Sequence, residues 1–234
     1  DHKCASIKDF YELMKPRVMS LVIFTALVGY ISGYTSSENV LNPYLSIIGI
    51  FAIALGAGSA GALNQWYDRD IDFKMERTKN RPIASGKVSV KEGLILSLSL
   101  CVIALVVLIQ FNNLTIALAL ASMPLAFTYP YMKRFTYWPQ LYLGITFNYG
   151  LLLGWSSIQN NITITPLVFY FGAIFWTLGY DTIYGFQDIK DDEIIGVKST
   201  SIKFKESPKK FLTMCYLITF FTILYLGYQM NFGL

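Results

Sequence analysis

The sequence predicts an all-α protein whose helices form a polytopic bundle across a membrane. Of its 234 residues, 54% are hydrophobic and only 15% are charged, whereas soluble domains carry about 25% charged residues. The charges are clustered, and the apolar stretches between them approach the length of about 17–25 residues that a helix needs to cross the hydrocarbon core. Seven spans are predicted, at 18–34, 44–63, 94–111, 114–131, 139–157, 164–184 and 211–231.

The basic residues predict how these spans are oriented. All 19 Lys and Arg, from Lys3 onward, lie before the first span or in the connections after the second, fourth and sixth spans. The alternate connections contain none, and of the 15 Asp and Glu only Glu38 is placed among them. The positive-inside rule assigns the basic side to the cytoplasm or the mitochondrial matrix. We therefore expect an integral protein of a bacterial or mitochondrial inner membrane, whose net charge of +4 reflects topology and not nucleic-acid binding.

The first acidic segment, GALNQWYDRDID, follows the second span directly. Asn64, Asp68 and Asp72 are spaced i, i+4 and i+8. At about 100° per residue, they share one stripe of a helix, while Asp70 points to the other side.

The second acidic segment, YDTIYGFQDIKDDEIIGVKST, begins at the inner end of the sixth span. Asp181, Asp188 and Asp192 are spaced i, i+7 and i+11. On a continuous helix they fall on nearly one line, with Tyr184 beside them and Asp191 turned away.

Two carboxylate stripes at the same membrane depth are what a magnesium-bound diphosphate requires. Mg²⁺ prefers hard oxygen ligands, usually one or two carboxylates together with phosphate and water. The predicted metal ligands are Asn64, Asp68, Asp72, Asp181, Asp188 and Asp192. The alternative is that the acids form surface ion pairs with nearby Arg and Lys, but acids that enter an apolar span are costly and usually functional.

Further residues near the stripes are candidates for substrate binding. Arg77 and Arg81 follow the first stripe and can contact phosphate, which Arg does bidentately. Lys133 and Arg134 offer a second basic point at the same surface. Tyr184 is the candidate for stabilising an allylic cation with its ring face.

These segments resemble the paired motifs of the UbiA superfamily of intramembrane prenyltransferases. The resemblance rests on NQWYDRDID with ERTKNRPIASG and on DTIYGFQDIKDD with GVKST, and covers nearly the whole chain. Asn64, Asp68 and Asp72 match the first motif, and the second is matched by Asp181, Tyr184, Asp188 and Asp192. The resemblance implies a helical bundle with a central cavity, magnesium-dependent loss of diphosphate from a polyprenyl donor, and attack by an aromatic acceptor.

The two halves of the chain are similar to different branches of that superfamily. KPRVMSLVIFTALVGY and ALGAGSAGALNQWYDRDID resemble protoheme farnesyltransferases, whereas the 129–155 segment and the second motif resemble 4-hydroxybenzoate polyprenyltransferases. We expect a single domain over 1–234 with a possible hybrid junction near 95–125, truncated at its C-terminus because the family usually has nine spans. The favoured acceptor is 4-hydroxybenzoate, and protoheme is the alternative.

Two other classes of function stay open from the sequence, a transporter and an inactive assembly subunit. A transporter predicts polar residues at the bilayer midplane on discontinuous helices. The acids here lie at the inner ends of spans that are predicted to be unbroken, which favours the enzyme.

Overall fold

The computed structural model describes residues 5–37 and 42–231, which form helices and turns with no strand among them. Lys3 and Glu38, which entered the topology prediction, lie outside the described residues. The chain divides into two units, Asp1–Phe24 with Asn42–Phe111 and Thr25–Leu41 with Asn112–Leu234. Helix α2 belongs to both units, because its first part lies in one and the rest in the other. The expected single domain and the hybrid junction both remain predictions.

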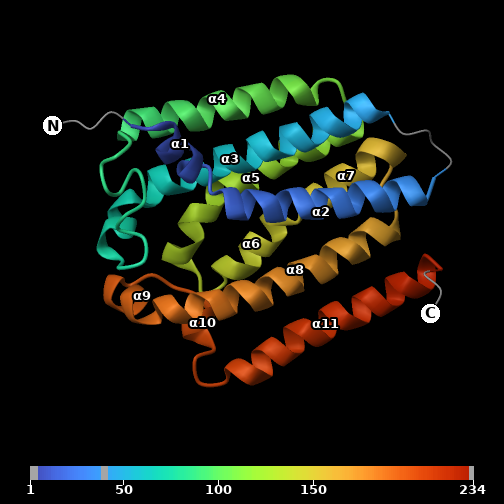
Figure 1. Cartoon of the computed structure of the whole chain (residues 1–234). Helices are drawn as coiled ribbons and strands as arrows, with labels where there is room; N and C mark the ends of the chain where they lie inside the picture. Colours follow the sequence, from blue (N-terminus) through green and yellow to red (C-terminus); the bar gives the residue numbers. More distant parts are fainter. Residues whose placement is uncertain (1–4, 38–41, 232–234) are drawn as a thin grey trace. The chain divides into compact units, whose positions relative to one another are not determined.

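The first unit contains α1, the start of α2, α3 and α4 (Figure 1). Their bounds are Ile7–Leu13, Pro16–Thr35, Pro43–Lys74 and Val90–Leu108. Helices α3 and α4 lie side by side and antiparallel (Figure 1). Two serines join them reciprocally, since the Ser59 Oγ donates to the Ser97 carbonyl at 2.7 Å and the Ser97 Oγ donates to the Ser59 carbonyl at 2.9 Å.

Local sequence explains where these helices begin. Asn42 caps α3 and Pro43 occupies its first turn, where a missing N–H costs nothing. Ser89 and Glu92 form a capping box at the start of α4. At 32 residues, α3 is about 48 Å long. This exceeds the hydrocarbon core of about 30 Å, and the charged residues of α3, from Asp68 to Lys74, all lie in its C-terminal turns.

The second unit contains the remaining part of α2 and the elements from α5 to α11. They are α5 (Asn113–Phe135), α6 (Pro139–Phe147), α7 (Tyr149–Gln159), α8 (Ile164–Gly185), the 3₁₀ turn η1 (Phe186–Asp188), α9 (Ile189–Ile195), α10 (Thr200–Lys203) and α11 (Pro208–Gln229). Helix α8 is central to this unit and packs against α6, α7 and α11. In Figure 1, α11 runs alongside α8.

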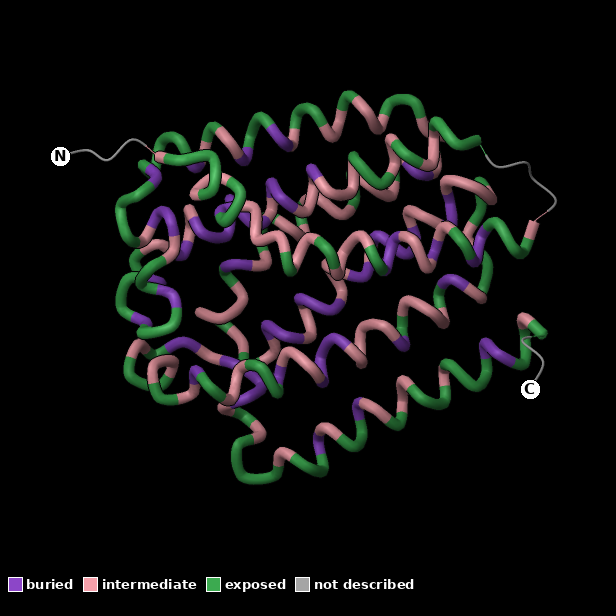
Figure 2. The backbone as a smooth tube through the Cα atoms, in the orientation of Figure 1, coloured by how far each residue is buried: buried purple, intermediate pink, exposed green. Residues whose placement is uncertain are grey.

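The predicted membrane character is confirmed. Within the described residues, five helices are long and apolar enough to cross a membrane, namely α2, α3, α4, α5 and α11. Figure 2 shows α4 and α11 exposed along much of their length. Many of their exposed positions are apolar, as at Val106 on α4 and Ile223 on α11. Lipid is the environment in which such surfaces are stable.

The fifth predicted span is not one continuous helix, which corrects the sequence prediction. Helix α6 ends at Phe147 and α7 begins at Tyr149. Between them, the buried Asn148 side chain donates to the Gly144 carbonyl at 2.8 Å and to the Thr177 hydroxyl of α8 at 2.8 Å. Asn side chains compete with the backbone for such hydrogen-bond partners, and the helix breaks at the residue that makes this contact with α8. Hydropathy averaged over a stretch of sequence does not detect a contact of this kind.

Candidate active site

The first acidic segment lies on the C-terminal turns of α3, as the spacing predicts. Asn64, Asp68 and Asp72 are all buried, and Asp72 is only 2% exposed. The Asp70 side chain is 83% exposed and pairs with Arg69 at the surface. Helical periodicity therefore separates the three buried side chains from Asp70, which confirms the predicted orientation of this stripe.

A basic side chain reaches Asp72 from the turns that follow α3. Arg81 Nη1 lies 2.9 Å from each carboxylate oxygen of Asp72. The buried Thr78 donates its hydroxyl to the Asp72 carbonyl at 3.0 Å, so the 75–89 connection folds back onto the end of the helix. Arg77, the other predicted phosphate contact in this segment, is exposed.

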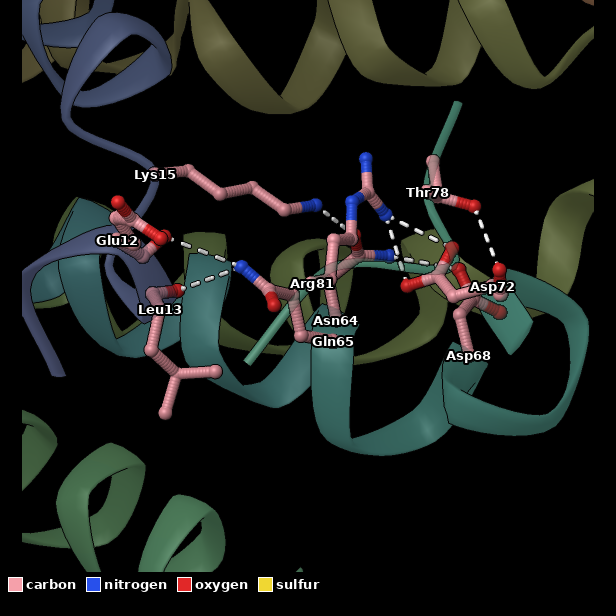
Figure 3. A network of polar contacts seen from close by, with 9 residues as sticks. All are labelled: Glu12, Leu13, Lys15, Asn64, Gln65, Asp68, Asp72, Thr78 and Arg81. Atoms are coloured by element: carbon pink, nitrogen blue, oxygen red, sulfur yellow. Dashed lines mark hydrogen bonds and ion pairs between the residues drawn. The ribbon is translucent and has the colours of Figure 1, made fainter. Parts of the chain in front are cut away.

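Figure 3 shows a second cation at this stripe, Lys15, which is one of the 19 basic residues that predict the topology. The Lys15 ammonium donates to the Asn64 amide oxygen, and Asn64 Nδ2 donates to Asp68 Oδ2 at 3.1 Å. The signal in the sequence is a lysine directly before Pro16, the residue that begins α2, but nothing local connects it to a residue 49 positions away.

The second acidic segment lies in the other unit and is not one straight helix. Helix α8 ends at Gly185, a 3₁₀ turn follows, and α9 begins at Ile189. A 3₁₀ turn has 3.0 residues per turn instead of 3.6, so the predicted continuous helix from Asp181 to Asp192 is wrong. The alignment of these acids at 100° per residue no longer follows from it. Asp188 is buried, whereas Asp181 and Asp192 are partly exposed.

Tyr184, predicted beside this stripe, is 55% exposed. It lies in the last turn of α8, one residue before Gly185. Its role as a cation-stabilising ring remains a prediction.

Buried polar side chains on α8, α10 and α6 form hydrogen bonds next to the second segment. Thr182 and Thr200, both fully buried, share a hydrogen bond of 2.6 Å between their hydroxyls. Ser201 donates to the Thr182 carbonyl at 2.7 Å, and the Thr200 N–H donates to Gln140 Oε1 at 2.9 Å. Thr200, the last residue of GVKST, and the adjacent Ser201 therefore connect α10 to α8 and α6 by hydrogen bonds. This structural role was not predicted from the sequence.

Lys133 and Arg134 lie in the last turn of α5. The Lys133 carbonyl accepts from the Lys198 N–H at 2.7 Å, and Lys198 Nζ donates to the Phe135 carbonyl at 3.2 Å. The two predicted basic residues are thus next to the segment that follows the second acidic motif, within the same unit.

The donor chemistry of the first segment fits magnesium. Asp68 and Asp72 provide two buried carboxylates one helical turn apart, and Mg²⁺ commonly takes one or two protein carboxylates and completes its shell with phosphate and water. Among the described residues, no three His, Cys, Asp or Glu side chains gather into a metal-binding group.

Known proteins with similar sequences are 4-hydroxybenzoate prenyltransferases. The chain is 46% identical over 170 residues to the mitochondrial 4-hydroxybenzoate polyprenyltransferase of Rattus norvegicus, which covers 72% of this chain and 45% of the rat protein. It is 43% identical over 193 residues to 4-hydroxybenzoate geranyltransferase 2 of Lithospermum erythrorhizon, covering 81% of this chain and 62% of that protein. The matched region thus spans about half to two thirds of the length of these relatives.

Solved structures of similar fold are UbiA homologues. One from Aeropyrum pernix K1 superimposes with a TM-score of 0.81 at 22% identity, covering 92% of this chain and 82% of that one. Another, from Archaeoglobus fulgidus and bound to GPP and Mg²⁺, gives 0.73 at 18% identity, covering 94% and 77%. The model of the UbiA prenyltransferase family matches residues 22–234. The chain therefore belongs to the UbiA prenyltransferase family.

Proposed function

We propose that this chain transfers a polyprenyl group from a prenyl diphosphate to 4-hydroxybenzoate within the membrane, with magnesium as cofactor. The observation that carries the proposal is the 46% identity to a 4-hydroxybenzoate polyprenyltransferase over 72% of the chain. The buried carboxylates of α3 support it, because buried acids at the end of an apolar helix are rarely structural. By this proposal the chain acts in ubiquinone synthesis and lies in a mitochondrial or bacterial inner membrane.

The acidic residues of both segments are the proposed metal ligands. Asp68 and Asp72 would hold magnesium on the first segment, and Asp181 and Asp188 on the second. Asp192 completes the proposed ligands, and the sequence alone also predicts Asn64 as an oxygen donor. Bound magnesium would neutralise the diphosphate and make it a better leaving group.

The basic side chains would bind the diphosphate and stabilise the charge that develops as it leaves. Arg77 and Arg81 serve the first segment, and Lys133 and Arg134 the second. The C–O bond of the donor breaks, and the diphosphate departs with the bonding electron pair. Apolar walls would exclude water from the remaining allylic cation, and the ring of Tyr184 is a candidate stabilising group.

An electron-rich carbon of the acceptor then forms the new C–C bond. With 4-hydroxybenzoate this is the ring carbon next to the phenol, and its proton leaves to a base. Protoheme remains the alternative acceptor, with attack from a vinyl group. The 4-hydroxybenzoate relatives favour the former.

The prediction of unbroken spans no longer counts against a transporter, since the fifth span is discontinuous at Asn148. The position of the acids in the last turns of α3 and α8 still does. Membership of a prenyltransferase family opposes a transporter as well. An inactive subunit of that family is distinguished only by activity.

The test is a transfer assay on membranes that contain the full chain. Labelled geranyl or farnesyl diphosphate is supplied with Mg²⁺, and 4-hydroxybenzoate and protoheme are offered in parallel. We expect prenylated 4-hydroxybenzoate by mass spectrometry, formed by the parent and lost in both Asp68→Asn and Asp181→Asn. Prenylated heme alone would assign the other acceptor, and equal transfer by parent and variants would disprove the proposed mechanism.

A further inference from the structure

The side chains of Lys15, Asn64 and Asp68 are linked by successive hydrogen bonds at the first acidic segment (Figure 3). The Lys15 ammonium donates to Asn64 Oδ1, and Asn64 Nδ2 donates to Asp68 Oδ2 at 3.1 Å. Asn64 and Asp68 are both buried on α3, whereas Lys15 comes from the short connection between α1 and α2.

The two neighbours of Asn64 define how its amide is turned. An ammonium group can only donate, and an ionised carboxylate can only accept. The opposite orientation of the amide would place its NH₂ against the ammonium and its oxygen against the carboxylate, and both contacts would be repulsive. The cation at position 15 therefore directs the Asn64 oxygen toward itself and the NH₂ toward Asp68.

The backbone holds Lys15 in the position that this contact requires. Lys15 has a φ of +52°, in the left-handed region that few non-glycine residues adopt. Pro16 alone does not account for it, because a residue that precedes proline is pushed toward extended backbone. A conformation of this kind persists where surrounding contacts hold it.

Contacts with α3 supply that support. The Gln65 amide, next to Asn64, donates to the carbonyls of Glu12 and Leu13 at 3.2 Å each. Gly61 lets the connection approach closely, since a Cβ there would lie 2.7 Å from the Met14 carbonyl oxygen. The fully buried Leu13 packs on Ala62 of the same helix. The turns of α3 that lead into the acidic segment are thus the turns that bind the α1–α2 connection.

We propose that Lys15 is a positioning residue for the metal-binding carboxylate Asp68 and acts through Asn64 as a relay. Asn64 then orients Asp68 instead of giving its own oxygen to magnesium, because that oxygen is engaged by Lys15. The proposal rests on the proposed function in that it takes Asp68 as a magnesium ligand. It assigns Lys15 a role that neither its charge nor its place before a membrane span predicts.

The first test measures the relay without metal. Thermal unfolding midpoints of the full chain in EDTA are compared for the parent, Lys15→Met, Asn64→Leu and the double variant, with Lys8→Met as a control. Lys8 lies on α1 with its side chain 82% exposed. We expect Lys15→Met to lower the midpoint more than Lys8→Met does, and to have no further effect once Asn64 is Leu, because residues in one network are not additive. Equal effects of the two lysine substitutions, or full additivity with Asn64→Leu, would overturn the relay.

The second test measures magnesium binding as the Mg²⁺ concentration that gives half of the maximal thermal stabilisation. Loss of a residue that orients a metal ligand typically costs about 10–100-fold in affinity, so we expect an increase of about tenfold for Lys15→Met. Lys15→Arg, which keeps a cationic donor, should restore most of the affinity. The double variant with Asn64→Leu should be no weaker than the weaker single variant. An Asn64→Leu effect that is undiminished in the Lys15→Met background would show that Asn64 binds the metal directly, contrary to the proposal.

The two proposals fail in different ways. If Mg²⁺ does not stabilise the parent, or stabilises Asp68→Asn equally, the magnesium site of the proposed function is wrong, while the EDTA experiment still decides whether the relay exists. If Asp68→Asn abolishes the response and Lys15→Met does not alter it, the magnesium site stands and the role of Lys15 is disproved.

Discussion

At the scale of single residues, α3 offers two aspartates that differ in burial and not in chemistry. Asp72 is 2% exposed and its carboxylate is bound by Arg81, whereas the Asp70 side chain is 83% exposed. Exposure of that degree leaves Asp70 outside the buried stripe, two positions from a proposed metal ligand. The same substitution, Asp to Asn, can therefore be compared at a buried and at an exposed position of one helix.

Asp72→Asn should abolish most of the Mg²⁺-dependent prenyl transfer, while Asp70→Asn should leave the rate near that of the parent. Loss of a metal ligand is expected to cost at least as much as loss of one preorganised transition-state contact, about 10²-fold. The rate of transfer from labelled prenyl diphosphate measures this, and EDTA should remove the activity of the parent. Equal losses in the two variants would show that burial on this stripe does not distinguish a ligand.

Arg81 should contribute to stability as well as to phosphate binding. Its guanidinium lies 2.9 Å from both oxygens of a nearly fully buried carboxylate. Breaking a buried ion pair by removing one partner costs about 3–5 kcal/mol, and the partial exposure of Arg81 places its removal at the lower end of that range. Arg81→Met should therefore lower the thermal midpoint clearly.

Arg81→Lys is the matched variant, because it keeps the charge and loses the planar guanidinium. We expect it to recover part of the midpoint and less of the transfer rate. A midpoint for Arg81→Met that equals that of the parent would mean that the ion pair is not formed in the membrane.

At the scale of elements, glycines determine how closely the helices approach one another. In the second unit, a Cβ at Gly154 of α7 would lie 2.2 Å from the Ala26 carbonyl oxygen of α2, and one at Gly29 would lie 2.0 Å from the Leu151 carbonyl oxygen. Both contacts are with backbone, which cannot move aside as a flexible side chain can. Small residues of this kind are how membrane helices come into close contact.

Gly154→Ala should therefore destabilise the second unit, since overpacking typically costs about 1–3 kcal/mol. The control is Gly56→Ala on α3, where nothing lies within 4 Å of the added methyl. That substitution should be neutral or stabilising by about 0.5–1 kcal/mol, because Ala favours the helix over Gly. The thermal midpoint should fall in Gly154→Ala and should stay equal or rise in Gly56→Ala, relative to the parent. A loss of stability in both variants would argue against a specific contact at Gly154.

At the scale of the whole molecule, the distribution of basic residues predicts one topology. The connection 75–89 and the segment around Lys205 should face the cytoplasm or matrix, and Asn160, between α7 and α8, should face the opposite side. Single cysteines at Glu76, Asn160 and Lys205, in a chain without its native cysteines, can be labelled with an impermeant maleimide in sealed vesicles of known orientation. We expect positions 76 and 205 to react from one side and position 160 from the other. Reaction of positions 76 and 160 from the same side would contradict the predicted orientation.

The membrane helices and the stripe on α3 were predictable from the sequence because both follow from local pattern. An apolar run of sufficient length predicts a membrane helix, and spacings of four residues place side chains on one face of any α-helix. The second stripe was predicted less well. The 3₁₀ turn after Gly185 and the break at Asn148 change the helical register, and the contact from Asn148 to Thr177 that accompanies the break is made between helices.

The sequence by itself determined that this is a membrane protein of the UbiA type with two acidic segments, because hydropathy and motif spacing are properties of short stretches of chain. Only the tertiary structure decided which distant polar groups lie beside those segments. Lys15 donates a hydrogen bond to Asn64, which is 49 positions away in the sequence. Gln140 accepts a hydrogen bond from the N–H of Thr200, which is 60 positions away. Such partners are brought together by helix packing. The close approach of the α1–α2 connection to Gly61, for example, positions the side chain of Lys15. Local sequence patterns do not carry that information.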